Sequence, residues 1–203
     1  MRKKSDRIPV KEFRAGVQKA VLKPVRYEGR QAVPSACFPM NMKIVLASDT
    51  HGKNDRLEIL EKSYPDALLF LHAGDFGRDP EIFDHWIKVA GNNDIYYPND
   101  LDSVREVIAQ NHRILLMHSH QYPVALRKKK MAALAREKDC DIVVFGHSHV
   151  PSICEEDGIL MINPGSLSRN RDGSLPSYAV LDLSGSKPQA QIMRYDDLPA
   201  GWK

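Results

Sequence analysis

Cysteine is scarce in this sequence: the 203 residues include three, Cys37, Cys140 and Cys154, and no CxxC pair. Three such positions make no paired disulfide framework, so we expect a protein of a reducing compartment, the cytoplasm. Long apolar runs are also missing. No stretch approaches the roughly 18 residues that cross a bilayer, and no apolar segment of a secretory signal follows the charged start. We therefore expect no association with a membrane.

The net charge of +3 hides an uneven distribution. Residues 1–40 carry a balance of +7, whereas the remainder carries 19 basic and 23 acidic residues. Four prolines interrupt the basic segment, and only Lys11–Leu22 could form a short helix. We expect residues 1–41 to be a mobile basic N-terminal extension and residues 42–203 to be one domain. The extension could bind nucleic acid, but a solvated tail is favoured because the basic run is interrupted and contains no repeat in which aromatic and basic residues alternate.

From Met42 onward the pattern is that of an α/β protein. Short apolar runs alternate with helical segments at first and pair into hairpins later, one of them turning at Asp157-Gly158. Asn54 is a plausible N-cap for the first helix, and Pro123 stands where the second would begin. We expect helices at 54–63 and 123–138, and strands at 43–47, 67–71, 86–90, 104–110, 113–117, 142–145, 159–162, 178–183 and 189–194. The sum predicts a layered α/β sandwich.

Potential metal ligands follow the strong strands of this pattern. Ligand sites in α/β sheets form beyond the carboxyl ends of the strands, where the loops converge. Each residue alone is common by chance, but their ordered placement, one group to a strand, is not. Imidazole, carboxylate and amide oxygen together suit two divalent ions, and two ions about 3.5–4 Å apart can clamp a phosphoryl group. The candidates are Asp49, His51, Asp75, Asn92, His118, His147 and His149.

The motifs that contain these residues resemble those of calcineurin-like metallophosphoesterases. They are Asp49-Thr50-His51-Gly52, Gly74-Asp75, Gly91-Asn92-Asn93-Asp94, His118-Ser119-His120 and Gly146-His147-Ser148-His149. Asn163-Pro164-Gly165-Ser166 resembles a motif of the small prokaryotic phosphodiesterase branch, whose fold a retromer subunit shares. The resemblance implies a metallophosphoesterase sandwich of two mixed β-sheets flanked by helices.

The resemblance also implies how the ligands divide between two metals. Asp49, His51, Asp75 and His149 would bind one ion. Asp75 would bridge to a second ion that Asn92, His118 and His147 also bind. A hydroxide between the ions would attack phosphorus in line. Manganese is the favoured metal, with nickel, zinc, iron, cobalt and magnesium as alternatives.

Two positions are candidates for handling the leaving group. Larger members of the family carry histidine where this chain has Asn93, and an amide can donate a hydrogen bond but supplies no proton at neutral pH. His120 is a second candidate, as a proton-handling residue or as simple loop packing. We therefore expect substrates with acidic leaving groups to react best.

The expected function is that of a metal-dependent phosphoesterase, with a phosphodiesterase of small phosphate esters favoured. A nuclease, a nucleotide or phosphoprotein phosphatase, and a catalytically weak scaffold with the same fold stay open, as does a monomer or a dimer. Arg169 and Arg171 could reach a phosphate. The basic run 127–130 could attract one too, although a solvated helix face is its favoured interpretation.

Overall fold

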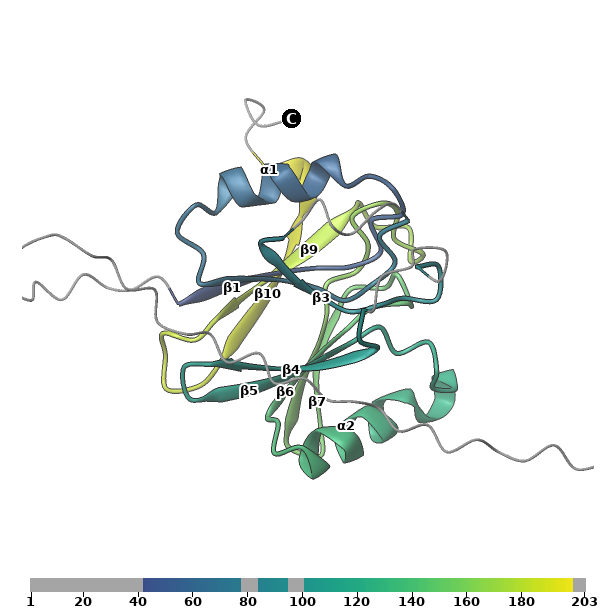
Figure 1. Ribbon diagram of the computed structural model, residues 1–203, viewed down its shortest axis with the longest axis vertical. Coiled ribbons are helices and arrows are strands. Elements are labelled where there is room, and N and C mark those ends of the chain that lie inside the picture. Colours follow the sequence, from purple (N-terminus) through teal and green to yellow (C-terminus); the bar gives the residue numbers. More distant parts are fainter. Residues whose placement is uncertain (1–41, 78–83, 95–100, 199–203) are drawn as a thin grey trace, which may run out of the picture.

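Two five-stranded β-sheets lie face to face in the structure, a computed structural model that describes residues 42–77, 84–94 and 101–198 (Figure 1). The expectations for residues 1–41 lie outside the described residues. The first sheet contains β1 (Lys43–Ala47), β2 (Leu69–His72), β3 (Trp86–Lys88), β9 (Ser177–Asp182) and β10 (Gln189–Arg194). The second contains β4 (Val104–Ala109), β5 (His112–Met117), β6 (Ile142–Phe145), β7 (Ser152–Glu156) and β8 (Ile159–Asn163).

Each sheet is mixed, which confirms the predicted fold class. The strand order of the first sheet is β10-β9-β1-β2-β3, and β1, β2 and β3 run parallel. The second sheet has the order β4-β5-β6-β8-β7, and β5, β6 and β8 run parallel. Antiparallel strands complete both sheets. Ala47 pairs with His72, and Met117 pairs with Phe145, so the carboxyl ends of neighbouring parallel strands align.

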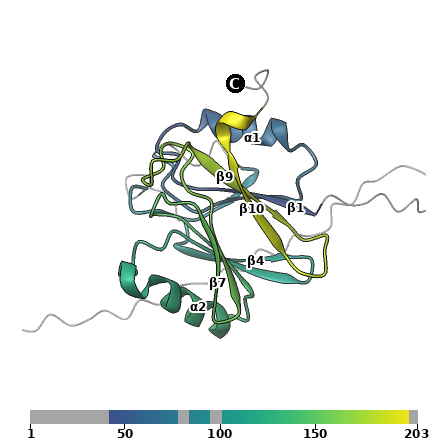
Figure 2. The same cartoon turned by 180° about the vertical axis from the view of Figure 1, so that it is seen from behind.

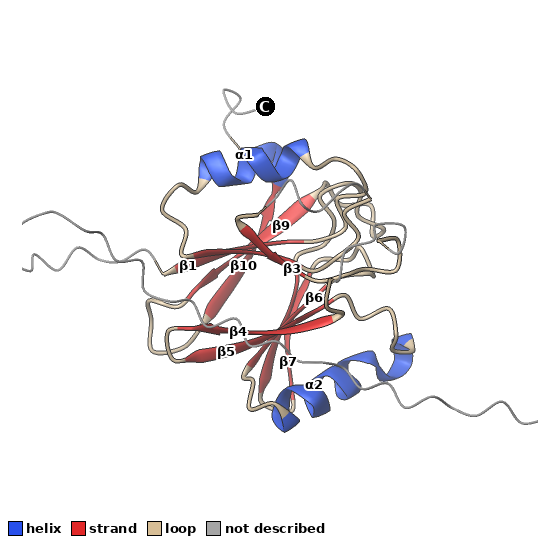
Figure 3. Ribbon diagram, in the orientation of Figure 1, coloured by secondary structure: helices blue, strands red, loops and turns tan. Residues whose placement is uncertain are grey.

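Side chains that alternate along β1 build two layers of the core. Ile44 and Leu46 pack into the cluster between the sheets, whereas Val45 belongs to the cluster that includes Leu57 and Leu60 of α1 (Asp55–Ser63). Successive side chains of a strand point to opposite faces, so one buried strand serves both layers. Helix α1 therefore covers the outer face of the first sheet (Figure 3).

The second sheet repeats this arrangement with α2 (Arg127–Glu137). Ile114 and Leu116 of β5 face the first sheet, and Leu115 packs in a cluster with Met131 and Ala135 of the helix. Short 3-10 turns precede α2 (η2, Val124–Leu126) and follow β10 (η3, Tyr195–Asp197). In the part of the chain that the structure describes, no helix is long and apolar enough to cross a membrane.

The observed elements follow the predicted ones, with differences at their ends. Asn54 occupies the N-cap position of α1, but its side chain makes no capping hydrogen bond. The second predicted helix starts as η2 and becomes α-helical at Arg127. β3 ends at Lys88, two residues early, because the Ala90 amide donates to the carbonyl of Asp102 as the chain leaves the sheet.

Candidate dinuclear metal centre

The predicted ligands lie in loops at one edge of the sandwich, where the parallel strands of both sheets end (Figures 1 and 2). Backbone hydrogen bonds join the first two loops: the amide of Asp49 donates to Gly74 O at 3.0 Å, and that of His51 donates to Asp75 O at 3.0 Å. The loop after β6 joins them, since the His147 amide donates to Asp49 Oδ2 at 3.0 Å. The three loops therefore form one connected structure.

Strained backbone marks these loops. Left-handed φ angles at non-glycine residues cost about 1–3 kcal/mol each and cluster at functional sites. Five predicted ligands have such angles, as does the serine after His118. The values are 54° for Asp49, 45° for His51, 61° for Asp75, 79° for Ser119, 71° for His147 and 55° for His149. The strain turns side chains from three separate loops toward a common point.

Two glycines allow the loops to approach closely. A Cβ at Gly91 would lie 2.1 Å from Asp75 Oδ1, and one at Gly146 would lie 2.0 Å from Ser48 Oγ and 2.9 Å from Asp49 Oδ2. A Cβ at Gly91 would also lie 2.4 Å from the backbone N of Asp75, so neither position accepts a side chain unless Asp75 or Ser48 shifts. Glycine is therefore required where the backbone passes beside the two acids.

Four predicted ligands form a compact group. Ligand atoms of Asp49, His51, Asp75 and His149 all lie within 4.8 Å of one another. His149 Nε2 is 3.0 Å from Asp49 Oδ1, and His51 Nε2 is 3.7 Å from both Asp49 Oδ1 and Asp75 Oδ2. The two imidazole Nε2 atoms are 3.2 Å apart. Mixed carboxylate and imidazole donors at this spacing suit a divalent transition metal.

A second group shares Asp75 with the first. His118 Nε2 lies 3.4 Å from Asp75 Oδ2 and 3.2 Å from Asn92 Oδ1. The ring of His147 lies edge-on to that of His118, with 5.2 Å between centroids. Burial and the positive charges of His118 and Arg127 lower the pKa of His147 to about 4, so its imidazole is neutral at pH 7. The structure thus brings Asp49, His51, His118 and His149 to Asp75, with Asn92 and His147 beside His118.

Outer hydrogen bonds set the orientation of two imidazoles. His118 Nδ1 lies 2.7 Å from the carbonyl of Ala73, and His149 Nδ1 lies 3.1 Å from that of Arg169. A carbonyl can only accept, so each Nδ1 carries the proton, and in the neutral ring the lone pair on each Nε2 is left for a metal ion. Metal-binding histidines are held this way. Asp49 Oδ1 is buried without a hydrogen-bond partner among the described residues, so the donor set fits a cation.

The carboxylates are ionised at neutral pH. Burial would raise the pKa of Asp49, but the imidazoles of His149 and His51 beside its Oδ1 outweigh burial and hold that pKa below its ordinary value. Burial would also raise the pKa of Asp75. The hydrogen bond and the charge of His118 outweigh burial and lower that pKa to about 2. Asp75 in turn raises the pKa of His118 against the effect of burial. Without metal, protons on imidazoles therefore balance the negative charge of the two carboxylates. In the metal-bound protein the ions would take this role.

Asp94 supports the site, a role that sequence reasoning missed. Its Oδ2 accepts from the amides of Asp75 (2.7 Å) and Gly91 (2.8 Å). Its Oδ1 accepts from those of Phe76 (2.8 Å) and Gly77 (3.3 Å). The sequence feature that could have revealed this role is the position of Asp94, an acid at the end of the Gly91–Asp94 motif that is not itself a predicted ligand. Asp94 ties two ligand loops together.

Asn93 and His120, the two candidates for the leaving group, lie in different positions. The Asn93 side chain donates from Nδ2 to Asp75 Oδ2 at 2.6 Å, and its amide donates to Asp75 Oδ1 at 2.8 Å. His120 is exposed, with its ring centroid 5.6 Å from that of His118 and 6.2 Å from that of His147. Burial and the charge of His118 lower the pKa of His120, so it is neutral at pH 7.

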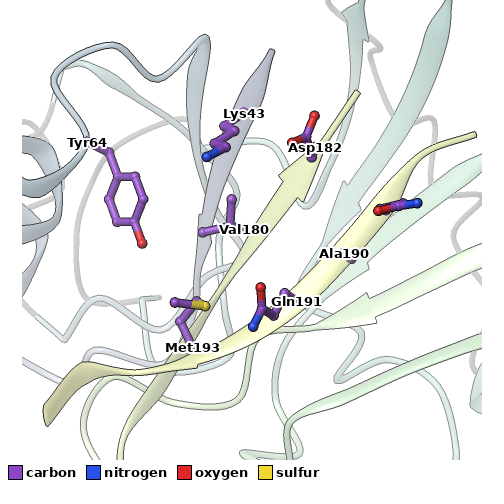
Figure 4. Close-up of a pocket in the computed structure, with 8 residues that line it drawn as sticks. Lys43, Tyr64, Val180, Asp182, Ala190, Gln191 and Met193 are labelled. Atoms are coloured by element: carbon purple, nitrogen blue, oxygen red, sulfur yellow. The ribbon is translucent and has the colours of Figure 1, made fainter. Parts of the chain in front are cut away.

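A separate hollow of about 440 Å³ lies at the other end of β1, over the paired strands β9 and β10 (Figure 4). Lys43, the first residue of β1, lines it, whereas Asp49 follows the last residue of that strand. Its lining contains no histidine, and its one carboxylate is that of Asp182. The hollow therefore lacks the donors of a metal site.

Comparison with curated proteins finds relatives that are named as phosphoesterases. A probable metallophosphoesterase of Mycoplasma pneumoniae is 36% identical over 151 residues, which cover 70% of this chain and 90% of the relative. The phosphodiesterase YfcE of Escherichia coli K12 is 28% identical over 169 residues, which cover 70% of this chain and 88% of the relative.

Solved structures share the fold. A predicted phosphoesterase from Streptococcus pneumoniae TIGR4 matches with a TM-score of 0.70 and 26% identity over 76% of this chain and 90% of that one. Vacuolar protein sorting 29 from Cryptosporidium parvum matches with a TM-score of 0.57 and 20% identity over 76% of this chain and 97% of that one, a likeness of fold alone. The family profile described as the calcineurin-like phosphoesterase superfamily domain matches residues 42–186. The chain belongs to the calcineurin-like phosphoesterase superfamily.

Proposed function

We propose that the protein is a phosphodiesterase that uses two divalent metal ions. Asp49, His51, Asp75 and His149 would hold one ion. Asp75, Asn92, His118 and His147 would hold the other. The observation that carries this proposal is the position of Asp75, whose Oδ2 lies 3.7 Å from His51 Nε2 and 3.4 Å from His118 Nε2. One carboxylate between two imidazole groups is the arrangement that a bridging ligand needs.

The metal ions and the protein's own residues would have different roles in the reaction. Two ions at this position supply a nucleophile at neutral pH and positive charge for the phosphoryl oxygens. The protein's own residues fix the geometry. Outer hydrogen bonds from His118 and His149 hold their rings in place, and Asn93 donates to both oxygens of Asp75. Held this way, Asp75 has little freedom to rotate between the two sets of ligands.

The leaving group must depart with little help from an acid. Asn93 carries no proton that it can give up, and its amide is engaged by Asp75. His120, the other candidate, has a lowered pKa and is neutral at pH 7. General acid catalysis typically contributes about 10²–10⁴-fold. Phosphodiesters with acidic leaving groups, such as phenols, are therefore the favoured substrates, in line with the name of the E. coli relative.

Manganese is the proposed metal, because a mixture of imidazole, carboxylate and amide oxygen suits it. Nickel, zinc, iron, cobalt and magnesium are the alternatives. The cytoplasm is the proposed location, since the sequence has no cysteine framework. A nuclease or a dedicated phosphatase would use the same centre. A scaffold would have no physical need for six left-handed, non-glycine positions in four ligand loops.

The experiment is a metal and substrate assay on the full chain. Metal-free protein is titrated with Mn²⁺ and assayed with bis(4-nitrophenyl) phosphate, an aryl diester, and with an alkyl phosphomonoester. We expect about two ions bound and much faster cleavage of the diester. His118→Ala should lose one ion and activity. His112→Ala, a matched change of a histidine at the other end of β5, should keep both. No metal binding and no hydrolysis would instead identify a scaffold.

A variant addresses the leaving group separately. Asn93→His places an imidazole where the chain has an amide. If a missing acid limits the reaction, this variant should gain activity on alkyl monoesters more than on aryl diesters. Equal wild-type rates on both substrate types would contradict the reasoning and point to His120 as the acid.

A further inference from the structure

The Asn163–Ser166 motif contributes no predicted ligand, yet the segment that it begins contacts two ligand loops. It ends β8, the neighbour of β6 in the second sheet. Asn163 Nδ2 donates at 3.2 Å to the carbonyl of Gly146, which begins the ligand loop after β6. The amide of Leu167 donates at 3.2 Å to the carbonyl of Ser48, which begins the ligand loop after β1. One short segment is therefore hydrogen-bonded to the loops at the ends of β6 and β1.

The side chain of Ser166 is fully buried, and its hydroxyl group has a partner at every hydrogen-bonding position. Its Oγ accepts from the amides of Ser168 at 3.0 Å and Arg169 at 2.9 Å. A serine hydroxyl has two lone pairs and one hydrogen to donate. Because the two amides can only donate, that hydrogen is left for the carbonyl of Asp49, which lies 2.8 Å from Oγ. The contact between Ser166 and Asp49 therefore has one direction.

The same segment holds His149, the other ligand, with its main chain. The amide of Arg169 donates to Ser166, and the carbonyl of Arg169 accepts from His149 Nδ1 at 3.1 Å. The amide of Arg171 donates to the carbonyl of His149 at 2.8 Å. The side chains of both arginines are exposed, so their main chain makes these contacts. His149 is therefore held both at its ring and at its backbone.

Asn170 restricts the conformation of this segment. Its side chain is buried, and its Oδ1 accepts from the amide of Ser166 at 2.7 Å. Its Nδ2 lies 3.0 Å from Ser174 Oγ, 2.7 Å from Leu175 O and 2.9 Å from Ser177 Oγ, and donates to these acceptors. The turn therefore has little freedom to move. The hydroxyl of Ser166 and the carbonyl that accepts from the imidazole stay in fixed positions relative to each other.

Asp49 and His149 belong to the same group of predicted ligands. Asp49 Oδ1 lies 3.0 Å from His149 Nε2, within the compact group of four ligands. The second group has its own outer contact, between His118 Nδ1 and the carbonyl of Ala73 at 2.7 Å. Among the residues that the structure describes, Ser166 makes no hydrogen bond to that second group. The support that Ser166 provides is therefore specific to one side of the centre.

We propose that Ser166 is a positioning residue for one metal ion of the pair, the ion that Asp49 and His149 would bind. Its hydroxyl fixes Asp49 directly and fixes His149 through the main chain of Arg169. The inference rests on the metal centre of the proposed function and adds a residue to it. Loss of an outer hydrogen-bonding partner typically lowers metal affinity by about 10–100-fold. A residue that supports two ligands of one ion should act on that ion and leave the other in place.

The test measures the binding of each metal ion to the full chain. Ser166→Ala removes the hydroxyl group and little volume. The matched control is Ser177→Ala, the same change at a second buried serine of this region. Ser177 Oγ donates to Pro164 O at 2.7 Å, and it has no described hydrogen bond to a ligand loop. Metal-free proteins are titrated with Mn²⁺ by calorimetry, and bound manganese is counted by elemental analysis. The thermal midpoint of each metal-free protein is measured as well.

We expect Ser166→Ala to weaken the binding of one ion by about 10–100-fold and to leave the affinity for the other unchanged. Ser177→Ala should bind both ions as the wild type does, even if both substitutions lower the thermal midpoint. Double variants identify the ion. Adding Ser166→Ala to His149→Ala should cause little further loss, because both changes affect the same ion. Adding it to His118→Ala should weaken the one ion that remains.

Several results would overturn the inference. Equal weakening of both ions in Ser166→Ala would show a general loss of structure, and unchanged binding of both ions would show that the hydroxyl is not needed. The same loss of one ion in Ser177→Ala would assign the effect to the segment as a whole. If Ser166→Ala does not fold, Ser166→Cys, which keeps a weak donor of similar shape, is judged by the same outcomes.

Failure of the proposed function gives a different result. A wild-type protein that binds two ions but cleaves no diester would refute the phosphoesterase function, and the metal titrations of the variants would still decide the role of Ser166. A wild-type protein that binds fewer than two ions would overturn both.

Discussion

Asp94 offers the sharpest test of how the site is held together. Its carboxylate is 4% exposed and accepts four backbone N–H groups, two on each oxygen, at 2.7–3.3 Å. The donors belong to two loops, 75–77 and 91, that carry or adjoin predicted ligands. Asp94→Asn preserves the shape of the side chain and replaces one acceptor oxygen with an NH₂ group. The substitution therefore sets a donor against two amides that also donate.

The expected cost follows from that count. The remaining amide oxygen can still accept two N–H groups, and two bonds to a charged acceptor are lost. Each is worth about 1.5–3 kcal/mol, so the substitution should lower the free energy of unfolding by about 3–6 kcal/mol. Proteins of this kind are stable by about 5–15 kcal/mol, so the variant should still fold. The loop with Asp75 would shift, and the affinity for metal should fall by about 10–100-fold.

Urea denaturation of the metal-free protein and Mn²⁺ titration of the native protein measure the two effects. Asp182→Asn is the matched control, because Asp182 accepts an amide hydrogen bond from Ser184 in an exposed turn far from the ligands. That variant should unfold and bind metal as the wild type does. An Asp94→Asn protein with wild-type stability and metal affinity would refute the reasoning, since it would show that the four contacts contribute nothing.

Three further outcomes are expected. Asp75→Asn should weaken both metal sites and lower turnover by more than about 100-fold, exceeding the effect of any other ligand, as metal analysis and kinetics would show; near-normal turnover with two bound ions would contradict it. Burial lowers the pKa of His72 to about 3, so the folded state resists its protonation. Relative to His72→Gln, the metal-free wild type should lose about 2 kcal/mol of stability between pH 7 and pH 5, as urea titrations would measure. Deleting residues 1–41 should leave thermal midpoint, metal binding and small-diester turnover unchanged. Weaker, salt-dependent cleavage of an oligonucleotide by the truncated protein would show that residues 1–41 bind polyanions. Aggregation of that protein would show that Lys11–Leu22 packs on the domain.

The ligands could be predicted from the sequence because their signal is local. Each lies within four residues of the end of a strand, as His147 follows β6, and parallel strands bring such positions to one edge. Asp49 and Asp75 were expected at that edge, and the register of β1 with β2 places them there. The fold class needed only this alternation of apolar runs, whereas the order of the strands and the faces that α1 and α2 cover were not predicted.

The role of Asp94 and the burial of Arg127 could not be found in the same way. The role of Asp94 depends on four amides that converge from two loops, and amides leave no trace in the residue types. Arg127 begins a run of four basic residues whose later members are exposed, so composition alone places it on a solvated face. Its burial depends on the turn after β5, where Tyr122 bonds to Ser119. Both features arise from tertiary contacts.

The supporting residues explain why the ligand loops keep a strained backbone. Left-handed φ at Asp49 would relax if the loop were free, but Ser166 Oγ donates to Asp49 O at 2.8 Å and Ser48 Oγ donates to Asp49 Oδ2 at 2.6 Å. Asp75 is held in the same way by Asp94. These buried hydrogen bonds offset the strain of the left-handed backbone at Asp49 and Asp75. That backbone conformation brings the two carboxylates close to each other. Mutual repulsion of those carboxylates disappears when a cation lies between them, so the arrangement is best understood as a site that folding prepares and metal binding stabilises.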